Sequence, residues 1–329
     1  MVLGLHQWVP QPWRASATLT IGAILLIIAA LLPFVTIKPA YATPEPLTIS
    51  DVPEHALIEP IAVGTVARVV GVEYEAQTID PESKSGFVDV VVYWQAAEPD
   101  EKDYVSFARL LGREHELVGQ INRHPACGMV PTSLWQDGQV WRDPYRIPVA
   151  EDAQAPSRLR LEVGLYDTQA DDTLGAVRLG EAKLAPPASE PDIGHPLSVT
   201  LNDGIDLRGY DLTPSEVSAG ETLTLTLYWS ARESPSRDYQ VLVHLLATDP
   251  QPVAQADSPP LAGDYPTSMW AAGETISDPH PMALPGDLPA GEYRLLVGMY
   301  DLRTMERLPR ADGTGATVSI PLQVSADRP

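Results

Sequence analysis

Cysteine and basic residues are scarce in this sequence of 329 residues. The single cysteine, Cys127, excludes a disulfide within the chain. Only 22 lysines and arginines accompany 44 aspartates and glutamates, which gives a net charge of −22. Phosphate recognition needs cationic side chains, so nucleic acid and anionic lipid headgroups are poor candidate partners. We interpret the acidity as a solubility feature of an exposed surface.

Short enzyme motifs are also missing. The sequence contains no G-x-S-x-G, no H-E-x-x-H and no glycine-rich phosphate loop. We therefore expect a protein that is not an enzyme and that carries no cofactor and no metal. A glycoside hydrolase that uses an unrecognised pair of carboxylates is a remote alternative, because sequence does not test the distance between two carboxylates.

One block of residues is present twice. Tyr93-Trp94 returns 135 positions later as Tyr228-Trp229, and Pro131-Thr132-Ser133-x-Trp135 returns as Pro266-Thr267-Ser268-x-Trp270. A period of this length corresponds to one whole domain per copy. Duplication also favours a binding module over an enzyme, because active sites are seldom built twice in tandem.

Apolar and polar residues alternate in both copies, which is the pattern of half-buried strands. One face of such a strand carries Leu223, Leu225, Leu227 and Trp229, and its counterpart carries Val88, Val90, Val92 and Trp94. The sequence has many Pro and Gly turns and no convincing amphipathic helix. It therefore predicts an all-β protein with two tandem antiparallel β-sandwich domains, Ig-like or jelly-roll-like, after an N-terminal hydrophobic leader.

The predicted boundaries follow the repeat and the proline-rich segments. They are a leader at 1–42, an extended spacer at 43–54, a first sandwich at 55–185, a linker at 186–193 and a second sandwich at 194–326. Residues 120–148 are predicted to form a long ordered loop, a kind of segment that often binds ligands.

The leader contains an uncharged stretch at residues 17–37, which is about the length needed to cross a bilayer. Arg14 precedes it, which keeps the amino terminus in the cytoplasm. An A-x-A pattern ends at Ala42 and suits cleavage by a signal peptidase. A cleaved signal peptide and a single uncleaved membrane anchor both remain open. Either one predicts that the acidic remainder lies outside the cytoplasm, secreted or membrane-anchored.

The repeated Pro-Thr-Ser-x-Trp segment is the best candidate site. In the second copy, Asp264 and Tyr265 precede Trp270, and a rigid loop with aromatic rings and carboxylates suits a sugar. Trp135 is the weaker duplicate, because Met129 and Val130 replace the Asp-Tyr pair there. The alternative is that each tryptophan plugs the open end of its sandwich. Trp94 and Trp229 are expected in the two cores.

Four aspartates recur in both copies, namely Asp143, Asp167, Asp278 and Asp301. A calcium site made of oxygen ligands is conceivable. Aspartates beside a proline or at a strand end are more often turn formers that accept backbone N–H bonds. His124 and Cys127 have zinc-like spacing, but Pro259 and Ala262 replace them in the second copy.

The second copy carries further motifs that resemble a known group of modules, among them Leu288-Pro289-Ala290-Gly291-Glu292-Tyr293-Arg294 and Gly298-Met299-Tyr300-Asp301. It is similar to the extracytoplasmic β-sandwich modules of Chloroflexota-type bacteria. Those modules are often found C-terminal to membrane glycosyltransferases of the protein-mannosyltransferase type. The resemblance covers 194–326 well and 55–185 more loosely. It implies a fold and a location rather than an activity.

Together these patterns predict a non-catalytic binding module at the cell envelope. Its partner would be a glycan or a glycosylated envelope protein, and two linked modules would add avidity. The alternative is a structural spacer or assembly subunit that binds only protein. Exposed, coplanar aromatic rings would favour the first function. Buried Trp135 and Trp270 together with a flat apolar patch would favour the second.

Overall fold

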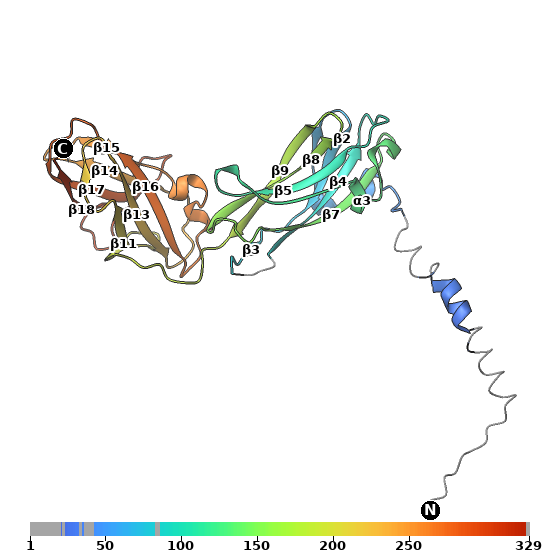
Figure 1. Cartoon of the computed structure of the whole chain (residues 1–329), viewed down its shortest axis with the longest axis horizontal. Coiled ribbons are helices and arrows are strands. Elements are labelled where there is room, and N and C mark those ends of the chain that lie inside the picture. Colours follow the sequence, from blue (N-terminus) through green and yellow to red (C-terminus); the bar gives the residue numbers. More distant parts are fainter. Residues whose placement is uncertain (1–20, 22–23, 33–34, 36–42, 83–85, 327–329) are drawn as a thin grey trace, which may run out of the picture.

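The computed structural model describes residues 21, 24–32, 35, 43–82 and 86–326. Two β-rich units follow one another along the longest axis of the molecule (Figure 1). Strands dominate both units, so the predicted all-β class is confirmed. Helical segments within the two units are single turns, such as α3 (Pro125–Gly128) in the first.

The first unit contains two sheets. One has the order β1-β2-β4-β7 and the other the order β3-β9-β8-β5-β6. All neighbours are antiparallel except β3 and β9, which run parallel. The strands are β1 (Leu57–Val63), β2 (Ala67–Glu73), β3 (Thr78–Ile79), β4 (Phe87–Ala96), β5 (Val105–Leu111), β6 (Leu117–Arg123), β7 (Val140–Pro148), β8 (Ser157–Asp167) and β9 (Asp172–Leu184).

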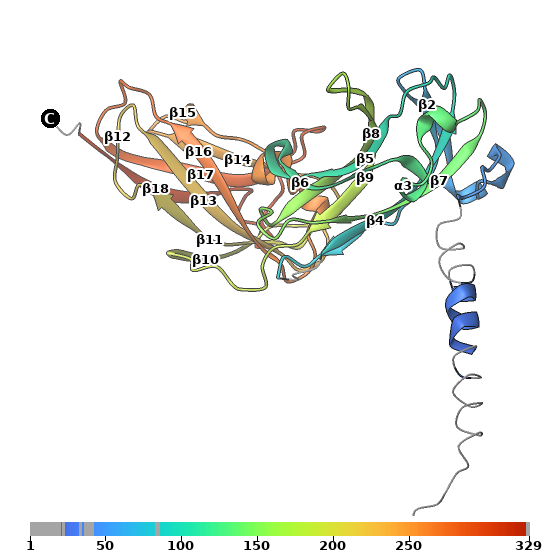
Figure 2. The ribbon, with the colours of Figure 1, turned by 45° about the vertical axis from the view of Figure 1, so that its right-hand side comes forward.

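The second unit repeats this plan, and Figure 2 shows its strands from another side. Its sheets have the orders β10-β11-β13-β16 and β12-β18-β17-β14-β15, and only β12 and β18 are parallel. The strands are β10 (His195–Thr200), β11 (Ile205–Thr213), β12 (Val217–Ser218), β13 (Thr222–Ala231), β14 (Gln240–Leu246), β15 (Pro252–Gln255), β16 (Thr275–Ala283), β17 (Gly291–Tyr300) and β18 (Val318–Ser325).

Each pair of sheets encloses its own apolar core. The alternating residues predicted for the inner faces are buried, including all four on β4 and all four on β13. Trp94 and Trp229 are completely buried and belong to the two cores, as predicted. The recurrence of these core residues at every second position therefore fixes which face of each sheet points inward.

Residues 120–148 are not one long loop, and that prediction is wrong. The segment begins inside β6, passes through two short helical turns and ends in β7. β7 pairs with β4 over its whole length, from Gln95↔Val140 to Phe87↔Pro148. The prolines at 144 and 148 argued against a strand here, because proline within a sheet is expected mainly on edge strands. β7 is an edge strand, which explains why it tolerates them.

The predicted extended spacer at 43–54 also needs correction. Leu47 pairs with Val140 of β7, and two 3₁₀ turns follow, η2 (Ile49–Asp51) and η3 (Glu54–Ala56). Val52 and Ala56 pack with Val70 and Tyr93 in a small apolar cluster of their own. The segment thus covers the outer face of the first sheet and belongs to the first unit.

Most of the predicted leader at 1–42, including the cleavage position after Ala42, lies outside the described residues. Within its apolar stretch at 17–37, residues 24–32 are helical and expose their apolar side chains. No helix among the described residues combines the length and the apolar character that crossing a membrane requires.

Candidate functional site

The repeated Pro-Thr-Ser-x-Trp segment lies in a loop before the edge strand of each unit. In the first unit, α3 (Pro125–Gly128) and η5 (Thr132–Leu134) form this loop, and residues 124–139 are called the first loop below. In the second unit, η6 (Pro260–Gly263) and η7 (Thr267–Met269) form it, and residues 259–274 are called the docking loop.

The threonine of the motif is buried and attaches the loop to the backbone of a neighbouring segment. Thr267 is inaccessible to solvent, accepts the N–H of Tyr239 at 3.0 Å and donates to the carbonyl of Arg237 at 2.7 Å. Thr132 makes the same two bonds in the first unit, to Tyr104 at 2.8 Å and Lys102 at 2.9 Å. The repeated Asp-Tyr pairs therefore recur because the loop is tied to them.

The neighbouring aspartates complete the attachment. Asp238 accepts the N–H of Ser268 at 2.9 Å, and Asp103 accepts that of Ser133 at 3.3 Å. Each bond satisfies a backbone donor that a short helical turn leaves free at its start. The hydrogen bonds of this repeated motif thus account for its Asp and Thr side chains without any ligand.

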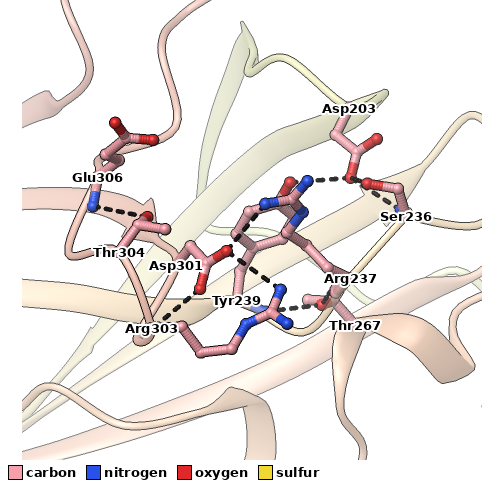
Figure 3. A network of polar contacts seen from close by, with 9 residues as sticks. All are labelled: Asp203, Ser236, Arg237, Tyr239, Thr267, Asp301, Arg303, Thr304 and Glu306. Atoms are coloured by element: carbon pink, nitrogen blue, oxygen red, sulfur yellow. Dashed lines mark hydrogen bonds and ion pairs between the residues drawn. The ribbon is translucent and has the colours of Figure 1, made fainter.

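Figure 3 shows how this attachment continues into a polar network in the second unit. Asp203 accepts bonds from Ser236 and from the hydroxyl of Tyr239. Asp301 accepts Nη1 of Arg237 at 2.9 Å and the N–H of Arg303 at 2.8 Å. These bonds lower the pKa of the Asp301 carboxyl to about 2, the backbone N–H of Arg303 contributing most.

Asp167 and Asp301 therefore act as turn formers, which agrees with the interpretation from their positions at strand ends. Asp167 accepts the N–H groups of Gln169 and Ala170 at 2.8 and 3.1 Å and pairs with Lys102 at 3.0 Å. Across the described residues, no cluster of three His, Cys, Asp or Glu side chains is arranged for a metal ion.

Asp143 and Asp278 are completely buried and hold the loops from the other side. Asp278 accepts the N–H of Leu261 at 2.8 Å, and Asp143 accepts that of Cys127 at 3.0 Å. Both donors have positive φ angles, of 51° and 60°, so the carboxylates support strained backbone.

The partners of these two carboxylates differ between the copies. Asp143 bonds to the hydroxyl of Tyr145 at 2.5 Å and to Arg123 at 2.8 Å. Asp278 pairs instead with Nε2 of the buried His280 at 2.8 Å. Burial by itself would lower the pKa of His280, but the hydrogen bond and the charge of Asp278 outweigh it and raise the pKa.

All four predicted ligand-binding residues are buried. Trp270, Tyr265, Asp264 and Trp135 are exposed by 1%, 0%, 9% and 4%. The indole N–H of Trp270 donates to the carbonyl of Tyr265 at 3.2 Å, which is the geometry of a plug. Neither tryptophan offers a ring face on which a sugar could stack, so the plug alternative describes both residues.

The docking loop also contacts the other unit. Nη2 of Arg160, on β8, lies 2.6 Å from Oδ1 of Asp264, and both side chains are nearly inaccessible. The backbone N–H of Arg158 donates to the carbonyl of Asp264 at 2.7 Å, and its guanidinium donates to Gly263 at 2.7 Å. Figure 1 shows the helical turns of the docking loop where the two units meet.

A second contact lies at the end of β9. Nζ of Lys183 is 2.7 Å from Oε1 of Glu274, donates to the carbonyl of Met269 at 2.6 Å and lies over the ring of Tyr265. The Tyr265 hydroxyl donates to Glu274 at 2.9 Å. Burial raises the pKa of Tyr265, so this phenol stays neutral.

The first loop lacks the chemistry of this junction. Met129, Val130 and Gln139 stand where the docking loop has Asp264, Tyr265 and Glu274. The far end of the second unit likewise has Glu292 and Gln323 where the first unit has Arg158 and Lys183. Arg294 stands where the first unit has Arg160. The Arg160–Asp264 pair is therefore specific to the docking loop, and the Lys183–Glu274 pair is specific to the docking loop and to the end of the first unit that it contacts.

No sequence pattern indicated Arg158, Arg160 and Lys183, the first-unit residues that contact the docking loop. The departure of Met129 and Val130 from the repeat was the available signal, because it marks where the copies have different tasks. No protein-family model matches the chain, and no curated protein matches it either, so the geometry of the site alone carries the functional argument.

Proposed function

We propose that this chain is a non-catalytic, extracytoplasmic module that works as a rigid two-unit spacer or assembly subunit. The observation that carries the proposal is the use of the docking loop. Its charged side chains form ion pairs with Arg160 and Lys183 of the first unit, and these ion pairs hold the two units in one orientation. A loop used in this way is unavailable to an external ligand.

The junction has the features of a fixed contact. It combines two ion pairs of low exposure with one backbone hydrogen bond across the units, from Arg158 to Asp264. Breaking a buried ion pair by removing one partner typically costs about 3–5 kcal/mol, because an unpaired charge stays behind. The pairs therefore oppose any hinge motion that would separate the loop from β8.

The connectivity supports an Ig-like sandwich over a jelly roll for both units. In the first unit, β2 pairs with β4 in one sheet. The short strand β3 that follows β2 belongs to the other sheet, where it runs parallel to the last strand, β9. The second unit repeats this with β11, β12 and β18. Ig-like sandwiches are common scaffolds for contacts at cell surfaces.

The location outside the cytoplasm is supported by the leader. Its apolar stretch at 17–37 and the A-x-A pattern ending at Ala42 are typical of export or anchoring. The resemblance to extracytoplasmic modules supports the same location. We propose an envelope protein or glycan as the partner, and the net charge of −22 argues against nucleic acid.

Rigidity can be tested with spin labels at the two ends. Cys127 is exposed and is the only cysteine, and Asp287 lies in the turn after β16, at the end of the second unit remote from the junction. Pulsed electron resonance on Asp287→Cys should give one narrow distance distribution. A broad distribution in this otherwise unchanged protein would contradict the spacer proposal.

A variant that lacks the ion-pairing residues can be made by copying three residues of the first loop into the docking loop. Asp264→Met, Tyr265→Val and Glu274→Gln together give the docking loop the residues that fold in the first loop. We expect the distance distribution to broaden in this triple variant. The control Gln139→Glu changes the first loop, away from the junction, and should leave the distribution narrow.

A further inference from the structure

A groove lies on the first unit, away from the junction loop. It has a volume of about 670 Å³ and runs over the outer face of β6, β5 and β8. This volume is within the range of roughly 300–1,000 Å³ that is usual for small-molecule sites. Its lining includes Phe107, Arg109, Gln120, Asn122 and Tyr166.

The strand register places these residues in rows across the sheet. Asn122, Phe107 and Gly164 form one row, because Phe107 pairs with Asn122 on one side and with Gly164 on the other. A Cβ atom at Gly164 would lie only 2.4 Å from Cζ of Phe107. The glycine therefore leaves room for the ring to lie on the sheet and form the floor.

The next row supplies hydrogen-bond donors. Gln120, Arg109 and Glu162 are register neighbours. The guanidinium of Arg109 lies over the Phe107 ring, 4.9 Å from its centroid, and pairs with Glu162 at 3.0 Å. The Arg109 side chain keeps 31% of its surface exposed. Stacking and pairing hold the guanidinium flat, and its remaining N–H groups can meet a ligand.

Two amides and a phenol complete the lining. Nε2 of Gln120 donates to Oδ1 of Asn122 at 2.5 Å, which leaves the Gln120 carbonyl and the Asn122 amine for other partners. Tyr166 stands half-buried on the opposite side, with its hydroxyl directed to Asp171. Phe107 is 4% exposed and lies beneath Arg109, so the half-buried Tyr166 is the ring that a ligand can contact. The groove thus combines this one aromatic ring with fixed donors and acceptors.

The charges in the groove are balanced. Arg109 is paired with Glu162, and Arg123 at the edge is paired with the buried Asp143. A neutral ligand with many hydroxyl groups fits this setting better than an anion or a cation. Aromatic side chains contact the apolar faces of sugar rings, and amides and guanidinium groups bond to their hydroxyls. We propose that this groove binds a neutral saccharide.

The second unit has a different surface at the same place. Leu242 and Leu296 replace Phe107 and Glu162 in the register, and His244 replaces Arg109. Nε2 of His244 pairs with Asp257 across the face at 3.2 Å. The chemistry of the groove is therefore assigned to the first unit only, and the second unit supplies matched controls.

The test is calorimetric titration of the full chain with neutral tetrasaccharides of glucose, mannose, galactose and N-acetylglucosamine. We expect saturable binding of at least one of them. The combined change Gln120→Ala and Asn122→Ala should weaken it about tenfold or more, because it removes two hydrogen-bonding groups. Arg109→His, which installs the residue of the second unit, should also weaken it. Gln255→Ala, the matched change in the second unit, should leave it unchanged.

Two results would overturn the proposal. One is the absence of binding by all four tetrasaccharides in the unchanged protein. The other is binding that persists in the Gln120→Ala and Asn122→Ala variant. Melting curves of all variants separate loss of the groove from loss of the fold, since both amides are on the surface strand β6. The spacer proposal rests on the junction and is unaffected by either result.

Discussion

Arg160 and Asp264 form an ion pair between the units, with Nη2 and Oδ1 2.6 Å apart. The pair is supported at both ends. The other amino group of Arg160 donates to the carbonyl of Gly112 at 3.0 Å, and the second oxygen of Asp264 accepts the N–H of Glu114 at 3.1 Å. A charge-assisted bond with these supports fixes geometry as well as charge.

Removing the carboxylate should destabilise the first unit as well as the junction. We expect Asp264→Ala to lower the free energy of unfolding by about 3–5 kcal/mol, because the charge of Arg160 loses its buried counter-charge. Urea denaturation followed by circular dichroism measures this change. Combining Arg160→Met with Asp264→Leu should recover most of the loss, since an apolar pair leaves no unpaired charge. A loss below about 1 kcal/mol for the single variant would indicate a solvated pair.

The threonine of the repeated motif should be essential for loop attachment. Thr267→Val keeps the shape but leaves the N–H of Tyr239 and the carbonyl of Arg237 without their partner. We expect a loss of about 1–3 kcal/mol, the usual cost of an unsatisfied buried polar group. Ser268→Ala is the control, because Ser268 is exposed and attaches through its backbone N–H. An equal loss of stability in both variants would contradict the proposed role of Thr267 in attaching the loop.

Replacement of Trp270 should act on stability and not on saccharide affinity. The side chain belongs to the core of the second unit, so Trp270→Ala should cost about 3–5 kcal/mol. Thermal melting measures the loss, and saccharide titration below the melting temperature should match the unchanged protein. If the variant is fully folded but no longer binds the saccharide, the binding site is in the docking loop and not in the groove.

The pair of His280 and Asp278 should make the second unit sensitive to pH. The folded-state pKa of His280 lies above the value of about 6.5 expected in the unfolded chain. Its contribution to stability is therefore fully present below about pH 6.5 and is lost as the pH rises through the folded-state pKa. Besides Asp278, the charge of Asp257 acts on this imidazole in the same direction.

Stability measured in urea at a series of pH values tests this expectation. His280→Tyr installs the residue that the first copy has at Tyr145, bonded to Asp143. A tyrosine does not titrate near neutral pH, so the variant should lose less stability than the parent between about pH 6 and pH 8. Parallel curves for the two proteins would show that His280 does not change its charge in this range.

Much of the fold was predictable because strand periodicity and the repeat are local signals. The core-facing apolar residues from Val88 to Trp94 and from Leu223 to Trp229 recur at every second position, and both strands lie in the cores as expected. β7 was missed because its prolines look like strand breakers in the sequence, and only its position at the edge of the sheet explains them. The attachment of residues 47–56 was missed for the same reason, since Val52 packs on residues distant in sequence.

The candidate site was only half predictable. The repeat marked the right loop, and Asp264, Tyr265 and Trp270 do lie together in it. Asp264 and Tyr265 also contact Arg160 and Lys183, which are more than 80 residues earlier and carry no motif. Aromatic and acidic residues in a loop have the same composition whether they face a ligand or another domain. The partner surface decides between the two, and sequence periodicity does not describe it.

The junction also gives the chain a direction. The docking loop at one end of the second unit contacts the opposite end of the first unit, where Arg160 and Lys183 lie. The contact between the units is therefore head-to-tail and lacks twofold symmetry. Exchanging the order of the two copies would bring Met129 and Gln139 against Glu292 and Gln323, and none of the present ion pairs could form. Although the copies share one fold, their order along the chain is not interchangeable.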